Sequence, residues 1–154
     1  MSENRYICVM KLLTKSLFTT SMGGSNSIKV VLPAVLRSKE LQKCYEKPYY
    51  EYVDSPNYKG FDYSLINYTD AAKTNVGNPY KYLPVVGAEL GELEGEERIN
   101  NGGLANANYA KLQYDGLSHD EKLKLKNALL RYCELDTMAM VLICHFFKLH
   151  APLQ

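Results

Sequence analysis

The chain has 154 residues, a formal net charge of +1, and a composition of 46% hydrophobic and 23% charged residues. These values fit a single domain over residues 1–154, exclude disorder throughout, and give no overall charge signal for binding a polyanion. No apolar run is long enough to span a bilayer and no signal peptide is recognised, so we expect a cytoplasmic protein without membrane contact. The four cysteines are widely spaced, which argues against a disulfide framework or a zinc knuckle.

The first third of the chain predicts two helices separated by a glycine turn. Residues 6–18 mix apolar and basic side chains in a pattern that favours a helix. After Gly23-Gly24, apolar residues recur at helical spacing from Ile28 to Val35. Pro33 should kink or restart this second helix, because proline lacks an N–H group and crowds the preceding turn.

Residues 45–100 predict a long, loop-rich insertion within the domain. Nine of the 13 tyrosines fall between Tyr45 and Tyr82, and proline and glycine interrupt the stretch, so we expect only one short hairpin, around Phe61–Tyr68. One interpretation is nucleic-acid binding, with bases on tyrosines and phosphates on lysines; its candidate residues are Lys29, Lys47, Lys59, Tyr49 and Tyr50. The other, which we favour, is that the tyrosines pack the loop against the body of the domain.

The C-terminal third predicts two helices. The first runs from Leu104 to about Tyr114 and ends before Asp115-Gly116. Ser118 followed three residues later by Glu121 is a capping-box pattern, which begins a second helix that continues to His150. A single long helix and a break at residues 134–137 are both compatible with the pattern.

Asp136 is the one polar residue on an otherwise apolar or aromatic helix face, which it shares with Tyr132 one turn earlier. A buried carboxylate costs several kcal/mol unless it is hydrogen-bonded, paired or bound to a cation. Two interpretations are equally compatible with the spacing. Asp136 is a ligand of a divalent metal, with Tyr132 placing a water or phosphate, or Asp136 or Thr137 caps a second helix.

Several segments resemble the signatures of an uncharacterised bacterial family, a domain of unknown function often found behind a RecB-like nuclease domain. Residues 24–34, GSNSIKVVLPA, resemble its GSxSIKxVLPA signature, and residues 128–141, ALLRYCELDTMAMV, resemble its closing signature. Residues 78–84 and the Asn101-Gly102-Gly103 turn with Ala105 are similar to intervening segments. The resemblance covers nearly all of residues 6–147.

This family resembles DnaQ-like exonucleases, whose RNase H-like core holds two divalent metals with four carboxylates. The resemblance implies that Tyr132 and Asp136 correspond to the Tyr-x-x-x-Asp motif of the last helix, so that Asp136 is a metal ligand and Tyr132 positions a water. The implied cofactor is Mg²⁺ or Mn²⁺. The chain departs from the pattern because no Asp-x-Glu strand precedes Tyr6, and Cys8-Val9 stands where relatives carry Asp-Leu.

One carboxylate cannot assemble a two-metal site, so we expect a catalytically inactive binding protein of nuclease ancestry. It would act through protein or nucleic-acid contacts, as an inhibitor or decoy of a nuclease system, with no cofactor; a protein partner is expected, and a homo-oligomer is compatible. The alternative is a Mg²⁺- or Mn²⁺-dependent 3'–5' exonuclease-like enzyme completed by a partner chain or by Glu134, Asp115 or Asp120. The expected fold is α+β and mainly helical, corresponding to the C-terminal part of an RNase H-like fold with an irregular tyrosine-rich insertion.

Overall fold

The computed structural model describes residues 22, 24, 25, 27–83, 99, 101–113 and 116–150. These residues form four α-helices and two short 3₁₀ helices: α2 (Ile28–Val35), α3 (Lys39–Cys44), η2 (Tyr49–Glu51), η3 (Pro79–Tyr82), α4 (Gly102–Leu112) and α5 (His119–His150). The mainly helical class predicted from the sequence is confirmed. Within these residues the only strand-like pairing is two isolated bridges, so no RNase H-like sheet is present there. The helix predicted over residues 6–18 lies outside the described parts.

Helix α5 is the longest element, and α2, α3 and α4 all pack against it. Its 32 residues span about 48 Å at 1.5 Å per residue. The predicted capping box forms at its start, where Ser118 Oγ accepts from the Glu121 N–H at 3.3 Å and the Glu121 carboxylate accepts from the Ser118 N–H at 2.8 Å. None of the described helices has the length and apolar content needed to cross a bilayer.

The helix continues without a break through residues 134–137, so the interpretation of Asp136 or Thr137 as the cap of a second helix is wrong. The segment contains no proline or glycine that would interrupt the backbone hydrogen bonds. The Thr137 hydroxyl donates to the Cys133 carbonyl at 3.1 Å, a bond that a threonine makes inside a helix.

Helix α2 forms where predicted, and Pro33 lies inside it. A proline at this position has no N–H to donate to the carbonyl of Lys29, four residues earlier. The Asn78 side-chain amide takes that place and donates to the Lys29 carbonyl oxygen at 3.2 Å. Pro33 therefore leaves one acceptor of α2 available to η3, and this bond ties the two elements together.

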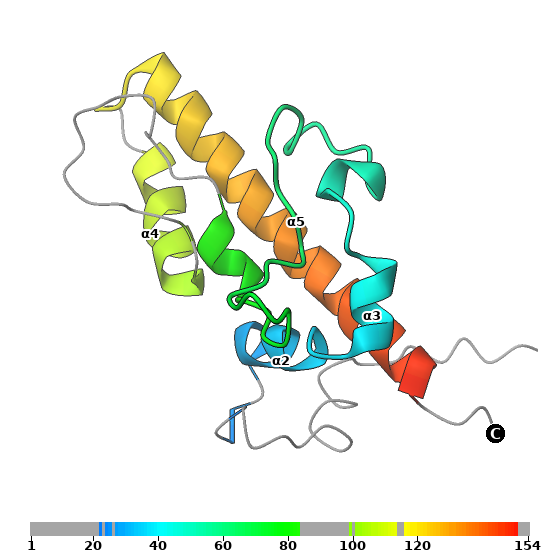
Figure 1. Ribbon diagram of the computed structural model, residues 1–154. Coiled ribbons are helices and arrows are strands. Elements are labelled where there is room, and N and C mark those ends of the chain that lie inside the picture. The colour runs from blue at the N-terminus through cyan, green and yellow to red at the C-terminus, as the bar shows by residue number, and fades with distance from the viewer. Residues whose placement is uncertain are drawn as a thin grey trace, which may run out of the picture.

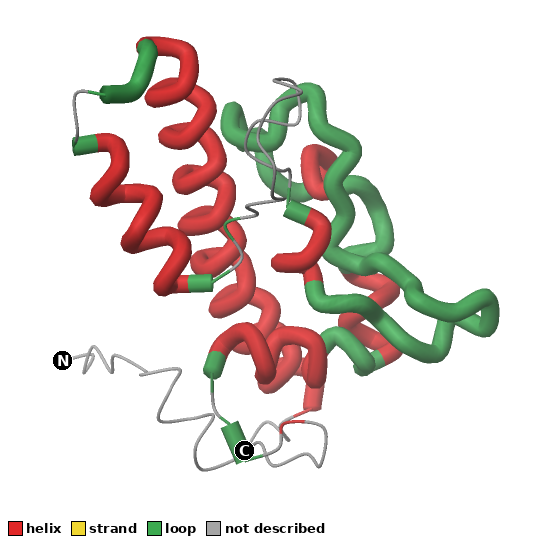
Figure 2. The backbone as a smooth tube through the Cα atoms, turned by 90° about the vertical axis from the view of Figure 1, so that its left-hand side faces the viewer, coloured by secondary structure: helices red, strands yellow, loops and turns green. Residues whose placement is uncertain are grey.

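The tyrosine-rich segment lies against one side of α5, and α4 lies against the other (Figure 1, Figure 2). Tyr49, Tyr58 and Tyr63 are buried, with ring centroids 4.6 to 5.8 Å apart. These contacts give the loop an aromatic core of its own. The hydroxyls of Tyr49 and Tyr58 donate to Glu134 and to the Arg131 carbonyl of α5, so the tyrosines pack the loop against the body, with these hydroxyls bonded to protein rather than to water.

The hairpin predicted around Phe61–Tyr68 is wrong in position. Ser64 bridges to Pro48, and Tyr68 bridges to Val76, so the reversal of the chain falls at residues 69–75. The Asp70 carboxylate accepts from the N–H groups of Thr74 and Asn75 there, which closes the turn. The hydrogen bonds to Asp70 therefore determine where the chain reverses, and the spacing of apolar residues does not predict that position.

Candidate functional site

Tyr132 and Asp136 lie one turn apart in the middle of α5, on the side that faces α2 and η3. The Tyr80 hydroxyl donates to Asp136 Oδ1, and the Lys29 ammonium donates to the Tyr132 hydroxyl. Four side chains from three elements therefore meet here. We call Lys29, Tyr80, Tyr132 and Asp136 the Asp136 cluster.

The local sequence explains how Lys29 and Tyr80 reach the carboxylate. The Asn78 side chain uses its amide group to bond the Lys29 carbonyl, and its oxygen accepts from the Tyr80 N–H at 3.1 Å, which caps η3. The same residue thus fixes the start of η3 and its distance from α2. Lys29 Nζ lies 4.5 Å from the centre of the Tyr132 ring and 5.2 Å from that of Tyr80, so the ammonium also contacts two aromatic rings.

Burial and the charge of Asp136 set the proton affinities in the cluster. Desolvation raises the pKa of Tyr132 to about 12, and the negative charge of Asp136 and a hydrogen bond to it act in the same direction. The same causes raise the pKa of Tyr80 well above its usual value. Desolvation lowers the pKa of Lys29, while attraction to Asp136 partly opposes that effect. At neutral pH both tyrosines therefore keep their phenolic protons.

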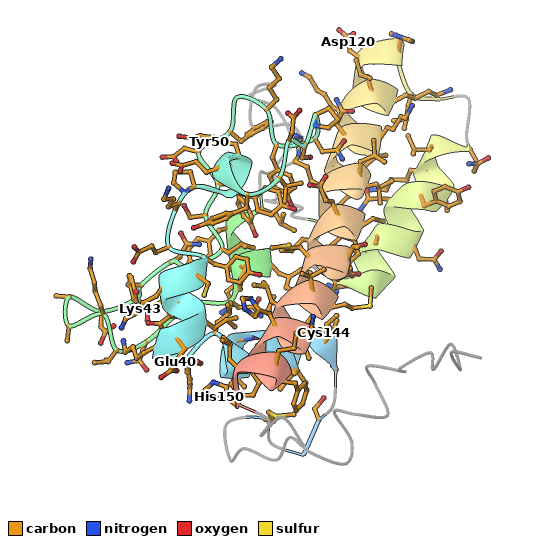
Figure 3. All side chains as sticks on the ribbon, turned by 90° about the vertical axis from the view of Figure 1, so that its right-hand side faces the viewer. Glu40, Lys43, Tyr50, Asp120, Cys144 and His150 are labelled. Atoms are coloured by element: carbon orange, nitrogen blue, oxygen red, sulfur yellow. The ribbon has the colours of Figure 1, made fainter. Side chains whose placement is uncertain are left out.

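The described residues do not fit a two-metal centre around Asp136. They contain no group of three or more His, Cys, Asp or Glu side chains placed to share a metal ion. Asp120 lies near the far end of α5 (Figure 3), about 24 Å away at 1.5 Å per residue. Asp115 falls outside the described residues. The Asp136 carboxylate accepts a hydrogen bond from Tyr80 and attracts the Lys29 ammonium, so protein groups already compensate part of its burial.

Glu134, the third candidate for completing a metal site, is committed elsewhere. Its carboxylate accepts from the hydroxyls of Tyr49 and Ser55 at 2.9 and 2.7 Å, and from the Asn57 amide at 2.7 Å. These three residues belong to the tyrosine-rich loop. Glu134 therefore anchors the loop to α5, a role that the sequence analysis missed.

The five residues predicted to bind nucleic acid do not form one surface. Tyr49 is 2% exposed and its hydroxyl is bonded to Glu134, so the base-stacking role predicted for it is wrong in this conformation. Lys29 belongs to the Asp136 cluster, and Lys47 pairs with Glu51 at 3.0 Å. Tyr50, 59% exposed, and Lys59 remain accessible in the loop.

Tyr132 and Asp136 lie together as the helical spacing predicted, but the sequence did not predict that Tyr80 donates to the carboxylate or that Lys29 donates to Tyr132. Residues 78–80 were singled out only as part of a resemblance. Asp136 is half-buried, and a carboxylate on an otherwise apolar helix face was the signal that a donor from another segment should reach it.

No family model matches this chain, and comparisons with curated proteins and with solved structures find no similar protein. The site is therefore interpreted from its own geometry and chemistry.

Proposed function

We propose that this chain is a binding protein of nuclease ancestry that contacts another macromolecule and does not cleave phosphodiesters by itself. The observation that carries the proposal is the environment of Asp136, where the Tyr80 hydroxyl donates to the carboxylate and the Lys29 ammonium, which donates to Tyr132, is close enough to be attracted to it. A two-metal nuclease requires several carboxylates around the ions. The resemblance to DnaQ-like exonucleases motivates the ancestry, and the hydrogen bond that Tyr80 donates to Asp136 supports the loss of catalysis.

A protein partner is favoured over nucleic acid. The burial of Tyr49 and the pairing of Lys47 with Glu51 weaken the case for a base-stacking, phosphate-binding loop. The formal net charge of +1 adds no general attraction for a polyanion. Inhibition of a nuclease system, or acting as a decoy in one, is a role that such a protein can fill without a cofactor.

The test combines calorimetry and a cleavage assay on the purified chain and on the Asp136→Asn variant. We expect no heat of Mn²⁺ binding that depends on Asp136, and no Mn²⁺- or Mg²⁺-dependent shortening of end-labelled single-stranded DNA or RNA by either protein. Metal-dependent cleavage by the unchanged chain that disappears in Asp136→Asn would overturn the proposal. Asp120→Asn is the matched control, since Asp120 is exposed and lies far along the same helix.

One observation favours a second candidate, a Mg²⁺- or Mn²⁺-dependent exonuclease-like enzyme completed by a partner chain. Tyr132 and Asp136 lie one turn apart and converge on the same cluster, as a Tyr-x-x-x-Asp catalytic pair requires. In that case Lys29 would have to give way to metal ions when the missing carboxylates arrive. Cleavage that appears only when a second chain is added, and that requires Asp136, would select this candidate.

A further inference from the structure

The outward side of α5 carries an apolar stripe that none of the described helices covers. Leu130, Met140 and Val141 are 41%, 42% and 48% exposed, which is unusual for three large apolar side chains within twelve positions of one helix. The stripe follows the spacing of three and four residues typical of helix–helix seams. We call the following residues the outer stripe: Leu130, Cys133, Thr137, Met140, Val141 and Cys144.

The C-terminal half of the outer stripe is hollowed into a groove. It has a volume of about 520 Å³ and lies between Tyr45 and the segment from Thr137 to Lys148. Figure 3 places Cys144, one of its lining residues, in the part of α5 that leads to His150. Tyr45 is fixed at one wall, because its hydroxyl and His145 Nδ1 are hydrogen-bonded at 3.0 Å. A groove of this volume with one fixed aromatic wall can accept apolar side chains of a partner.

The charged residues of α5 that flank the outer stripe are basic. Lys126 lies one helical turn before Leu130 and Lys148 lies one turn after Cys144, and both lysines are exposed. The two carboxylates that α5 carries between these lysines are already engaged, Glu134 by the tyrosine-rich loop and Asp136 by its cluster. A lysine therefore lies one turn beyond each end of the apolar stripe. Neither of the two carboxylates between these lysines on α5 is available to neutralise them.

We infer that the outer stripe is a docking site for an acidic amphipathic helix of a partner protein. The inference rests on the proposed function, that this chain acts by contact, and it names the partner's chemistry. A second copy of the chain fits poorly, because an antiparallel pair centred on Thr137 sets Lys126 of one copy against Lys148 of the other at both ends. A parallel pair sets each lysine against itself. An opposite charge on the partner removes this repulsion.

The stripe also defines the partner's length and pattern. From Leu130 to Cys144 it extends about 21 Å, which corresponds to roughly four helical turns. The partner helix needs apolar residues at spacings of three and four over that length, with large ones opposite the groove. It needs carboxylates one turn beyond each end, opposite Lys126 and Lys148.

Fluorescence anisotropy of two synthetic helical peptides tests the inference on the full chain. Both peptides are about 22 residues long and have leucines at spacings of three and four. The acidic peptide carries glutamates at its flanking positions, and the basic peptide carries lysines there. We expect the acidic peptide to bind roughly tenfold more tightly than the basic one, with the difference shrinking as salt screens the charges. Met140→Glu should weaken binding of the acidic peptide roughly tenfold or more. The double variant with Lys126→Glu and Lys148→Glu should bind the basic peptide more tightly than the acidic one.

Two exposed residues away from the outer stripe provide matched controls. Lys59→Glu and Tyr109→Glu make the same charge and polarity changes elsewhere and should alter affinity by less than about twofold. Equal binding of both peptides, no binding at all, or binding unaffected by Met140→Glu would overturn the inference. Self-association in sedimentation that Met140→Glu abolishes would overturn it too, because the occupant would then be a second copy. If the peptides fail these tests and the chain shows no metal-dependent cleavage, only the docking site is refuted. Metal-dependent cleavage by the chain would refute the proposed function.

Discussion

Glu134 offers the sharpest prediction about stability, because one side chain receives three hydrogen bonds from the tyrosine-rich loop. Tyr49, Ser55 and Asn57 all donate to its carboxylate at 2.7 to 2.9 Å. A hydrogen bond to a charged group contributes about 1.5–3 kcal/mol, and a donor left unpaired in a buried position costs a similar amount. Ser55, Asn57 and Glu134 are only half-buried, so water replaces part of the loss. Glu134→Ala should therefore lower the free energy of unfolding by about 3 kcal/mol.

Urea unfolding followed by circular dichroism measures this free energy, and thermal unfolding should show a fall of roughly 6–12 °C in Tm. Glu134→Gln keeps one acceptor oxygen but turns an amide N–H₂ toward the same donors, so its loss should be intermediate, about 1–2 kcal/mol. Glu46→Ala is the control, because Glu46 is exposed in the same region, and it should change stability by less than about 0.5 kcal/mol. An effect of Glu134→Ala as small as that of Glu46→Ala would refute the anchoring role.

Three further predictions follow from α5. Leu142 is fully buried, so Leu142→Ala should lower the free energy of unfolding by about 2–5 kcal/mol. Leu130→Ala on the exposed side should lower it by less than about 1 kcal/mol. Equal losses of unfolding free energy in the two variants would contradict the faces assigned to these residues. Ser118→Ala removes the capping oxygen and should cost about 1 kcal/mol in the same assay, and a neutral result would argue against the capping box. The folded pKa of Tyr132, about 12, lies above its unfolded value of about 10, so its contribution to stability is complete below pH ~10 and is lost as the pH rises toward ~12. In Tyr132→Phe the free energy of unfolding should therefore fall less steeply with pH over that range. An unchanged slope of unfolding free energy against pH would show that this phenol does not contribute.

Local signals in the sequence predicted three of the four described α-helices, α2, α4 and α5, but not α3 or the two short 3₁₀ helices. The capping box at Ser118 and the apolar spacing after it depend on residues three or four positions apart, which a helix brings together whatever the rest of the fold does. Helix α4 begins two residues before the predicted start because the Asn101 side chain accepts from the Leu104 N–H, which caps the helix ahead of the two glycines. The position of the hairpin was missed because the reversal is set by hydrogen bonds from the Thr74 and Asn75 N–H groups to the Asp70 carboxylate, which the spacing of apolar residues does not reveal.

The candidate site was predictable only in part. The sequence showed that Tyr132 and Asp136 share a helix face and that the carboxylate needs a partner. It did not show which segment supplies that partner. Lys29 precedes Tyr132 by 103 positions and Tyr80 precedes Asp136 by 56, and both reach the site because Asn78 ties η3 to α2.

The sequence by itself determined the helical class, the start of α5, and the one carboxylate whose partial burial calls for a partner, because each of these follows from short-range backbone geometry and solvation. Only the tertiary structure decided which groups become the partners of that carboxylate. Packing of α2 and η3 against α5 places an ammonium and a phenol beside Asp136, and packing of the loop commits Glu134 to three donors. Which charges neutralise one another depends on distances between segments far apart in the chain, and spacing along the chain does not encode those distances.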